Sequence, residues 1–326
     1  MIEARAPGKV VLWGEYAVLL GAPALVMAVD RYAVCHLTAG GAAWGFSAAG
    51  FEAPDATFSR HRLLGPEAPA ATDAASIPWH VLHALDTDKL AFGGRVHTDT
   101  SGFYENGEKL GLGSSAALTA AVYGAFCELL GQQSDYRTAL HIHHNLQGKL
   151  GSGIDVAAAY FGGLLKFRRD DAPTPADPHH WMLPDSVHTA FLWTGHGAAT
   201  PGHLRRFESW LRSAADTQPI EALRQISEAL FETAKLLDGL AEYRNRLLAL
   251  DAAAGLGIYD ASHQALDRLA SDNGLVYKPC GAGGGDIGAA FSEDPEALDA
   301  FAERAKQRGF TPLALESASH GIEITR

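Results

Sequence analysis

The segment EKLGLGSSAALTAAVYGAFCELL, residues 108–130, is the most informative part of the chain. Gly111 and Gly113 carry no side chains, so the loop exposes its backbone N–H groups. Small and apolar residues continue from Ser115 to Leu130 at helical spacing, and a glycine ends the run. A helix that begins near Ser115 points its positive end at the two glycines, so the segment favours an anion there.

Several interpretations of this loop compete. The string from Gly111 to Ala116 fits the GxGxxA pattern of dinucleotide sites, but no buried strand precedes it and a second helix, not a parallel strand, is expected after it. A Walker-type loop is excluded because the sequence lacks its Gly-Lys-Ser/Thr ending. Ser114 and Ser115 can cap the helix, contact phosphate oxygens or ligate Mg²⁺. From the loop alone, an ordinary helix cap and a phosphate site both stay open.

The composition excludes several classes of protein. The chain has 326 residues, of which 47% are hydrophobic, so it can bury a large core and suggests two domains. A formal charge of -12 argues against broad binding to nucleic acid or to an anionic membrane. Three widely separated cysteines and the lack of a signal-type or membrane-spanning run predict a cytoplasmic protein with reduced thiols. Oligomeric state is left open, a homodimer included.

Strand and helix patterns alternate through both halves of the chain. The polar, proline-rich segment 168–180 predicts a boundary between a domain of residues 1–175 and a domain of residues 176–326. The mixture of patterns predicts an α+β fold. Strands are expected at 9–13, 24–29, 32–39, 188–195 and 288–292 and as a pair at 311–317 and 321–326, and helices at 115–130, from 134 or 135 to about 147, between 204 and 272, and near 294–308.

Two further glycine-rich places could contact a ligand. In Ala6–Arg31, Lys9 stands at the start of a strand and could neutralise a phosphoryl group, or it is a surface lysine at a strand edge. In KPCGAGGGDIGAAF, residues 278–291, five of the eight residues from Gly281 to Gly288 are glycine. Such a run is explained by a backbone pressed against a ligand or by a flexible turn.

Read in order, four segments resemble the signature motifs of the GHMP kinase superfamily, and their versions are most similar to those of phosphomevalonate kinases. Mevalonate kinases typically lack the acidic residue that Asp286 supplies after the triple glycine. Trp13 and Cys280 depart from the usual small aliphatic residue and serine, and either could reshape an acceptor pocket. The four segments are PGKVVLWGEYAVLLGAPALVMAVDR (7–31), KLGLGSSAALTAA (109–121), GSGIDVAAAYFGG (151–163) and KPCGAGGGDIGAAF (278–291).

The resemblance implies a fold and a set of site residues. It implies a ribosomal-S5-like N-terminal domain and a ferredoxin-like C-terminal domain, with ATP, Mg²⁺ and a small-molecule acceptor bound in the cleft between them. Lys9 and Asp155 would be catalytic. The ATP phosphates would be bound by Lys109, Gly111, Leu112, Gly113, Ser114 and Ser115, with Ser115 on the metal ion. The acceptor would contact Glu15, Tyr16, Ser152, Gly153, Ala282, Gly283, Gly284 and Asp286.

The residues themselves leave some of these roles open. Asp155 opens a short helical run, so it either serves the chemistry or only complements the helix dipole. Thr200 either approaches the cleft or caps a helix that begins at Pro201. The histidines of 141–144 lack a third ligand at a suitable spacing for a metal site. A phosphomonoester acceptor would require extra cations at the cleft, and about a third of these candidates are expected to face it: Lys9, Arg31, Lys109, Lys149, Lys166, Arg168, Arg169, Lys278 and His144.

The leading hypothesis is an ATP-dependent kinase that phosphorylates 5-phosphomevalonate to the diphosphate in the mevalonate route to isoprenoids. A kinase for an unphosphorylated alcohol, mevalonate first, is the alternative in the same class. A non-catalytic metabolite sensor and a decarboxylase built on the same fold are more remote alternatives.

Overall fold

Two long antiparallel strands form the spine of the molecule. In the computed structural model, which describes residues 1–51, 53–147, 151–169, 178–198 and 200–326, β1 (Ile2–Trp13) pairs with β2 (Pro23–Ala39). The strands expected at 24–29 and 32–39 are therefore one strand. The register shifts between Pro7 and Gly8, so that Asp30 and Arg31 of β2 have no register partner on β1 and β2 continues past this polar pair as a bulge.

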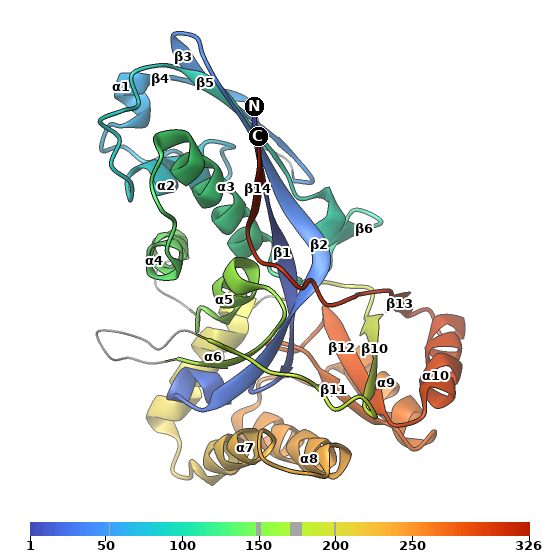
Figure 1. Ribbon diagram of the computed structural model, residues 1–326. Helices are drawn as coiled ribbons and strands as arrows, with labels where there is room; N and C mark the ends of the chain where they lie inside the picture. The colour runs from blue at the N-terminus through green and yellow to red at the C-terminus, as the bar shows by residue number, and fades with distance from the viewer. Residues whose placement is uncertain (52, 148–150, 170–177, 199) are drawn as a thin grey trace.

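The first sheet has eight strands, and helices cover one of its faces (Figure 1). Its main order is β14-β1-β2-β5-β3-β4, and β8 also pairs with β2 and β9. The other strands are β3 (Ala43–Ala49), β4 (Ala56–Ser59), β5 (Gly94–Asp99), β8 (Leu164–Arg168), β9 (His179–His180) and β14 (Glu323–Thr325). Short elements beside it are η1 (Ala17–Leu20), α1 (Arg60–Leu63), η2 (Ser101–Phe103) and the hairpin β6 (Tyr104–Glu105) and β7 (Glu108–Lys109).

The predicted helix after the glycine loop is the central helix of this domain. It is α3 (Ser114–Leu130), and it is buried along most of its length against β1 and β2. Packed around it are α2 (Ser76–Leu82), α4 (Tyr136–Leu146) and α5 (Ile154–Phe161). A helix that is apolar on all sides is stable only where other elements surround it, which explains this central position. The helix expected from 134 or 135 is confirmed as α4, capped by Asp135.

The second sheet has four antiparallel strands in the order β11-β12-β10-β13. When β10, β11, β12 and β13 are numbered 1 to 4, the strand order of this sheet is 2-3-1-4. This is the strand order of a ferredoxin-like domain, as the resemblance implies. Its strands are β10 (His188–Trp193), β11 (Val276–Pro279), β12 (Ile287–Ser292) and β13 (Thr311–Leu313), and its helices are α6 (Thr200–Ser213), α7 (Gln218–Ala229), α8 (Leu236–Ala254), α9 (Ala261–Ser271) and α10 (Pro295–Gln307). The α+β class is confirmed.

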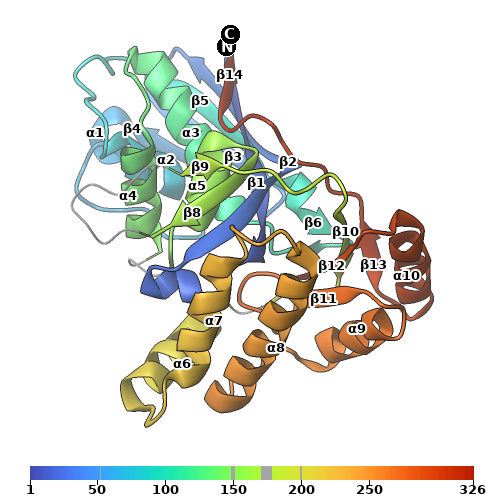
Figure 2. The same ribbon diagram turned by 60° about the horizontal axis from the view of Figure 1, so that its bottom comes forward.

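The expected strand pair at the end of the chain is wrong. β13 pairs with β10 in the second sheet, whereas β14 crosses back and pairs with β1, placing Glu3 opposite Thr325. The two termini consequently lie side by side in both views (Figures 1 and 2). Gly124 of α3 permits this return, because a Cβ there would lie 2.8 Å from Ile322. The boundary expected at 175 lies outside the described residues.

No helix in the described part of the chain is both long enough and apolar enough to cross a membrane.

A fully buried ion pair connects the two sheets. Lys278 Nζ on β11 lies 2.6 Å from Glu15 Oε1 in the turn after β1, and the two side chains are 0% and 1% exposed. The Tyr243 hydroxyl on α8 donates to Glu15 Oε2 at 2.6 Å and accepts from the Gly14 N–H at 2.9 Å. Lys278, one of the candidate cleft cations, therefore does not line the cleft. Its charge is matched by a carboxylate inside the protein.

Loss of one partner of this pair should destabilise the fold strongly. Lys278→Met leaves the Glu15 carboxylate buried without its cation, and we expect it to lower the free energy of unfolding by about 3–5 kcal/mol. Glu15→Gln combined with Lys278→Met removes both charges and should recover most of that loss. Urea denaturation measures all three proteins.

The exposed pair of Arg168 and Glu228 is a matched control. Its side chains are about half exposed, so Arg168→Met should cost less than about 1 kcal/mol. Equal losses for Lys278→Met and Arg168→Met would contradict a special role for the buried pair.

Candidate active site

A cavity of about 460 Å³ brings the predicted motifs together. Four predicted residues are not among those that line it: Leu112, Gly153, Gly283 and Gly284. At Gly283 and Gly284 the backbone packs too closely for a side chain, since a Cβ at Gly283 would collide with Ile258 and one at Gly284 with His203. The predicted residues that line the cavity are Lys9, Glu15, Tyr16, Lys109, Gly111, Gly113, Ser114, Ser115, Ser152, Asp155, Ala282 and Asp286.

The glycine loop rests directly on β1. The Leu112 carbonyl oxygen accepts a hydrogen bond from the Lys9 N–H at 2.8 Å. This approach requires a glycine at position 8, because a Cβ there would lie 2.8 Å from the same oxygen. The Pro7-Gly8-Lys9 motif and the loop, more than 100 residues apart in sequence, thus form one structural unit.

Lys9 lies between the loop and Asp155. Its ammonium group donates to the Gly111 carbonyl oxygen at 3.2 Å. A Cβ placed on Gly113 would be 3.1 Å from Lys9 Cγ and 3.5 Å from Asp155 Cβ, so the three residues meet at one point. A cation, a carboxylate and the positive end of α3 therefore face the same space, which suits a phosphoryl group in transfer.

The first turn of α3 differs from an ordinary serine cap. The cap residue is Gly113 with a left-handed backbone (φ 78°), and no side chain caps the helix. Ser114 is the first helical residue and is buried, and both serines line the cavity. Their hydroxyls are consequently available to a ligand and are not used as helix caps.

Asp286 lies against the other side of the loop. A Cβ on Gly111 would come 2.2 Å from Asp286 Cγ, and Asp286 Oδ1 accepts from the Ala198 N–H at 2.9 Å. Burial raises the pKa of Asp286, while the hydrogen bond from Ala198 and the nearby cations Lys9 and Lys109 oppose that rise. Burial and Lys9 lower the pKa of Lys109, and Asp286 counteracts them. The carboxylate and the two lysines form one electrostatic group.

The turn after β1 forms the opposite wall of the cavity. The Tyr16 hydroxyl donates to the Ala282 carbonyl oxygen at 2.6 Å, and Tyr16 has a positive φ of 59°. Both oxygens of Glu15 are already engaged, by Lys278 and Tyr243. Glu15 therefore forms part of this wall while Lys278 and Tyr243 hold its carboxylate in place.

The candidate cations are distributed unevenly. Lys9 and Lys109 line the cavity, whereas Arg169 does not line it but donates to the carbonyl oxygen of the lining residue Leu19 at 3.5 Å. Two candidates form contacts elsewhere on the surface. Arg31 donates to the Ala314 carbonyl oxygen, and Arg168 pairs with Glu228. Lys166 lies over the ring of Phe231, and His144 packs beside Gly153. Lys149 lies outside the described residues.

The two unusual residues of the motifs behave differently. Trp13 is fully buried and packs against the rings of Trp181 and Phe231, with centroids 5.4 and 5.1 Å away, and it does not line the cavity. Cys280 does line it, and burial raises the pKa of its thiol to about 11. Of the two departures, only Cys280 touches the space in which an acceptor would lie. Thr200, the first residue of α6, also lines this space.

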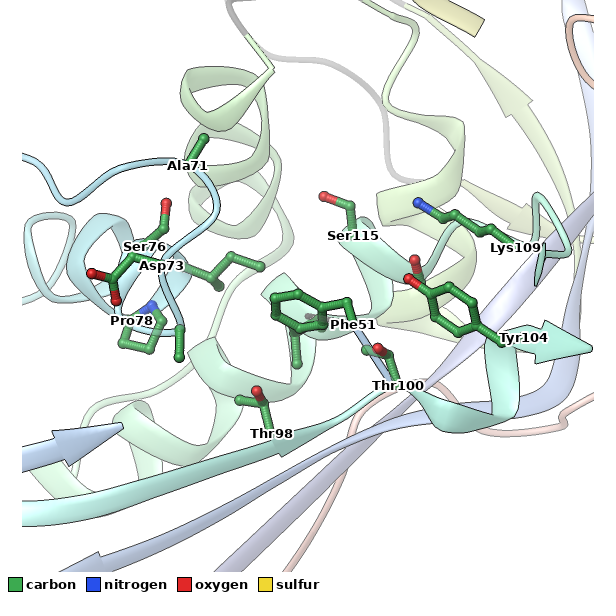
Figure 3. Close-up of a pocket in the computed structure, with 14 residues that line it drawn as sticks. Phe51, Ala71, Asp73, Ser76, Pro78, Thr98, Thr100, Tyr104, Lys109 and Ser115 are labelled. Carbon is green, nitrogen blue, oxygen red and sulfur yellow. The ribbon is translucent and has the colours of Figure 1, made fainter. Parts of the chain in front are cut away.

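A second cavity, of about 280 Å³, was not predicted from the sequence (Figure 3). It shares Lys109, Ser114 and Ser115 with the first cavity, so the two spaces meet at the glycine loop. Its remaining lining is largely apolar and hydroxyl-bearing and, apart from Phe51 and from Leu118 of α3, comes from the irregular segment before α2, from α2, from the end of β5 and from the hairpin: Phe51, Ala71, Asp73, Ala74, Ser76, Ile77, Pro78, Thr98, Thr100, Tyr104 and Leu118. No motif or periodicity marks those segments.

The oxygen donors of the main cavity fit Mg²⁺. The hydroxyl of Ser115 and the carboxylates of Asp155 and Asp286 line the same space. Within the described residues, no group of three or more His, Cys, Asp or Glu side chains gathers to hold a metal ion. The two carboxylates and the hydroxyl suit Mg²⁺, which is usually held by one or two carboxylates together with substrate phosphates and water.

The packing of Gly111 can be tested directly. Gly111→Ala places a methyl group on Asp286 at a residue with φ 77°, and we expect it to weaken binding of an ATP analogue at least ~10-fold by displacing the loop. Gly107→Ala is the matched control, because Gly107 has φ 84° but open space around its Cβ position. It should cost about 1 kcal/mol of stability and leave binding intact. Calorimetric titration compares them, and equal affinities would contradict this role of the loop.

Comparisons with known proteins agree with this geometry. The GHMP kinases N terminal domain matches residues 81–163. The phosphomevalonate kinase of Streptomyces sp. (strain CL190) is 30% identical, covering 98% of this chain and 98% of its own. The mevalonate kinase of Aeropyrum pernix is 27% identical over 97% of each chain. The structure of Streptococcus pneumoniae phosphomevalonate kinase in complex with phosphomevalonate and AMPPNP has a TM-score of 0.71 at 21% identity, covering 97% of this chain and 100% of that one.

The similarity to the Streptomyces enzyme covers 98% of this chain and therefore extends over both sheets. The chain therefore belongs to the GHMP kinase family and is a phosphotransferase similar over its whole length to phosphomevalonate kinases.

Proposed function

We propose that the protein transfers the γ-phosphoryl group of ATP to 5-phosphomevalonate, giving 5-diphosphomevalonate and ADP. The observation that carries the proposal is the meeting of Lys9, Gly113 and Asp155 at one point of the main cavity. The acceptor is inferred from the full-length similarity to a phosphomevalonate kinase, and Asp286 at the end of the glycine run supports it.

The two adjoining cavities suggest how ATP lies. The loop N–H groups and the start of α3 would bind the phosphates at the place where the cavities meet. The nucleoside would then occupy the smaller cavity, where Phe51 and Tyr104 offer aromatic surface (Figure 3). Mg²⁺, when bound, would neutralise phosphate charge beside Ser115. Lys9 is placed to neutralise charge that develops on the transferred group.

The acceptor would enter from the side of the turn after β1. Tyr16, Ser152, Ala282 and Thr200 line that end of the cavity and supply hydroxyl and carbonyl groups. A phosphomonoester has its second pKa near ~6, so its attacking oxygen is largely deprotonated at neutral pH. The difficulty is then the repulsion between two anions, which Lys9 and Lys109 would reduce. Asp155 would orient the acceptor more than it would remove a proton.

The setting proposed for this reaction is the cytoplasm. All three cysteines are free and buried, which fits a reducing compartment.

Mevalonate is the alternative acceptor. The full-length relatives include a mevalonate kinase at 27% identity, and the same cavity could accept an alcohol with Asp155 as general base. Asp286 and the higher identity to a phosphomevalonate kinase favour the phosphorylated acceptor.

An acceptor panel distinguishes the two. We expect ADP release with 5-phosphomevalonate and at least ~100-fold lower kcat/KM with mevalonate, because the site provides cations for a second anion. Product analysis should show the diphosphate and no carbon dioxide. Turnover of mevalonate without turnover of its phosphate would exclude the proposed acceptor.

Lys9 and Asp155 should act mainly on the chemical step. Lys9→Met and Asp155→Ala are each expected to lower kcat at least ~100-fold while affinity for ATP stays largely intact. Lys166→Met is a matched charge control, because Lys166 lies over the Phe231 ring and does not line the cavity. Steady-state kinetics and titration with an ATP analogue provide the readouts. Wild-type kcat in Lys9→Met or Asp155→Ala would remove that residue from the mechanism.

A further inference from the structure

Asp286 has a backbone conformation that few residues with a Cβ adopt. Among the described residues other than glycine, a positive φ occurs only at Tyr16, Asn106 and Asp286, and for Asp286 it is 58°. Left-handed backbone is unfavourable for residues with a Cβ, and it persists only where the surroundings hold it. Both Tyr16 and Asp286 line the main cavity. The contacts around Asp286 must therefore hold its backbone in this conformation at the site.

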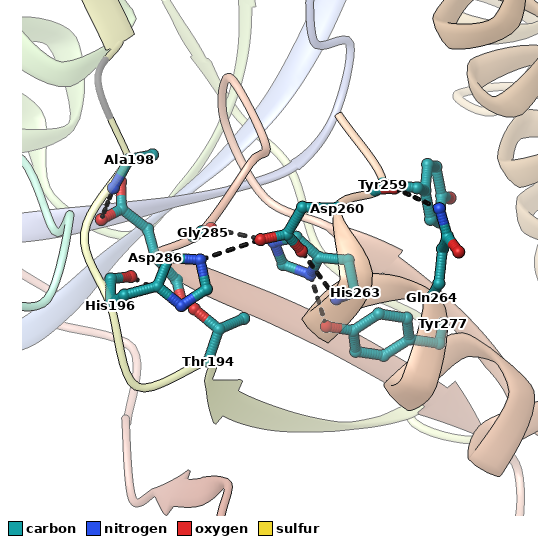
Figure 4. Close-up of polar contacts among 10 residues, drawn as sticks. All are labelled: Thr194, His196, Ala198, Tyr259, Asp260, His263, Gln264, Tyr277, Gly285 and Asp286. Carbon is teal, nitrogen blue, oxygen red and sulfur yellow. Dashed lines mark hydrogen bonds and ion pairs between the residues drawn. The ribbon is translucent and has the colours of Figure 1, made fainter. Parts of the chain in front are cut away.

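Hydrogen bonds fix the peptide groups on both sides of Asp286 (Figure 4). Its N–H donates to the His196 carbonyl oxygen at 2.9 Å, and its own carbonyl oxygen accepts from the N–H and hydroxyl of Thr194 at 2.9 and 3.0 Å. The remaining group of the preceding peptide, the Gly285 carbonyl oxygen, accepts from His263 Nε2 at 2.9 Å. Because both peptide planes are held, φ and ψ of Asp286 are held as well.

The chemistry of this contact determines the tautomer of His263. A carbonyl oxygen can only accept, so Nε2 carries the proton and donates it to Gly285. Nδ1 then accepts from the Tyr277 hydroxyl at 2.8 Å. Burial lowers the pKa of His263 to about 4, so the ring is neutral near pH 7 and this arrangement is kept. The side chain is 0% exposed and both ring nitrogens have partners.

The position of His263 is itself fixed by Asp260, the cap of α9. One carboxylate oxygen of Asp260 accepts from the His263 N–H at 2.9 Å, and the other lies 2.8 Å from His196 Nε2. His196 is the residue whose carbonyl oxygen accepts from Asp286. The start of α9 therefore holds both ends of the peptide group that precedes Asp286.

We propose that His263 is a positioning residue for the phosphoryl-transfer site: through the Gly285 carbonyl oxygen it holds Asp286 in the left-handed conformation that presses its carboxylate against Gly111. The inference rests on the proposed function, because it takes the main cavity as a phosphoryl-transfer site. The contacts of His263 do not depend on which acceptor is used. Without the contact, the Gly285–Asp286 peptide can rotate, and the carboxylate leaves the loop and its lysines.

Two substitutions of His263 separate its two hydrogen bonds. In His263→Gln the side-chain amide nitrogen replaces Nε2 and can still donate to Gly285, whereas in His263→Asn the shorter side chain can reach the Tyr277 hydroxyl but not Gly285. We expect His263→Asn to lower kcat at least ~10-fold in folded protein and His263→Gln to restore most of it. Gln264→Ala is the control from the same helix, since Gln264 donates to the Tyr259 carbonyl oxygen at 2.8 Å and does not contact Asp286.

A double-mutant cycle identifies the route of the effect. Asp286→Gly removes the carboxylate and tolerates a left-handed backbone, so it leaves nothing for His263 to position. The proposal expects His263→Asn to change kcat less than ~2-fold in an Asp286→Gly background, although it changes kcat at least ~10-fold in the natural sequence. The cycle is run with ATP and whichever acceptor the natural protein turns over, so a different acceptor identity leaves it valid.

Hydrogen exchange supplies a readout that needs no substrate. The amide of Asp286 is bonded to His196, and His263→Asn should accelerate its exchange at least ~10-fold while amides in α3 stay unchanged. Independent, multiplying effects in the kinetic cycle would overturn the proposal, because His263 would then act through general stability. Unchanged exchange at Asp286 would overturn it equally, whether or not the protein phosphorylates 5-phosphomevalonate.

Discussion

The buried ion pair of Glu15 and Lys278 determines how the two sheets meet. Two charges out of water are stable only with each other and with further polar partners, which here include the Tyr243 hydroxyl. The pair fixes the turn after β1 against β11. That turn directs Tyr16 towards Ala282, and β11 leads straight into the glycine run. The wall of the cavity therefore depends on a contact behind it, and neither sheet could shift there without exposing or separating the two charges.

Much of the fold follows from patterns in the sequence, and the exceptions have physical reasons. Helix periodicity predicted α3 and α4 within a residue or two, and membership of the GHMP kinase family and the α+β class are confirmed. Periodicity cannot tell which sheet a short strand joins, so β13 and β14 were wrongly paired with each other. The strand patterns also left a gap at residues 30–31, but these two residues form a bulge within β2, opposite Pro7 and Gly8.

Site residues could be predicted from the sequence where the residue type has a single clear physical reason, as glycine does at points of close approach. Gly8 and Gly111 mark places where backbone or side chains approach too closely for a Cβ, Gly113 supplies the left-handed cap of α3, and these positions meet in the structure. Charge gave a weaker signal, because a lysine beside a motif can equally be buried, as Lys278 is. Neither the second cavity nor the support of Asp286 by His263 has a motif, since both arise from contacts between segments far apart in sequence.

The return of β14 to β1 has a consequence for how the chain is made. Glu3 pairs with Thr325, a residue far away from it in the sequence. During synthesis the Glu3–Arg5 edge of β1, the strand that carries Lys9 and supports the glycine loop, lacks its β14 neighbour until residues 323–325 have been made. An unpaired edge invites association with other chains, and contacts between distant residues form slowly. The first sheet, which supports the glycine loop, is thus completed only after all strands of the second sheet have been made, and the nascent protein exposes an unpaired strand edge until then.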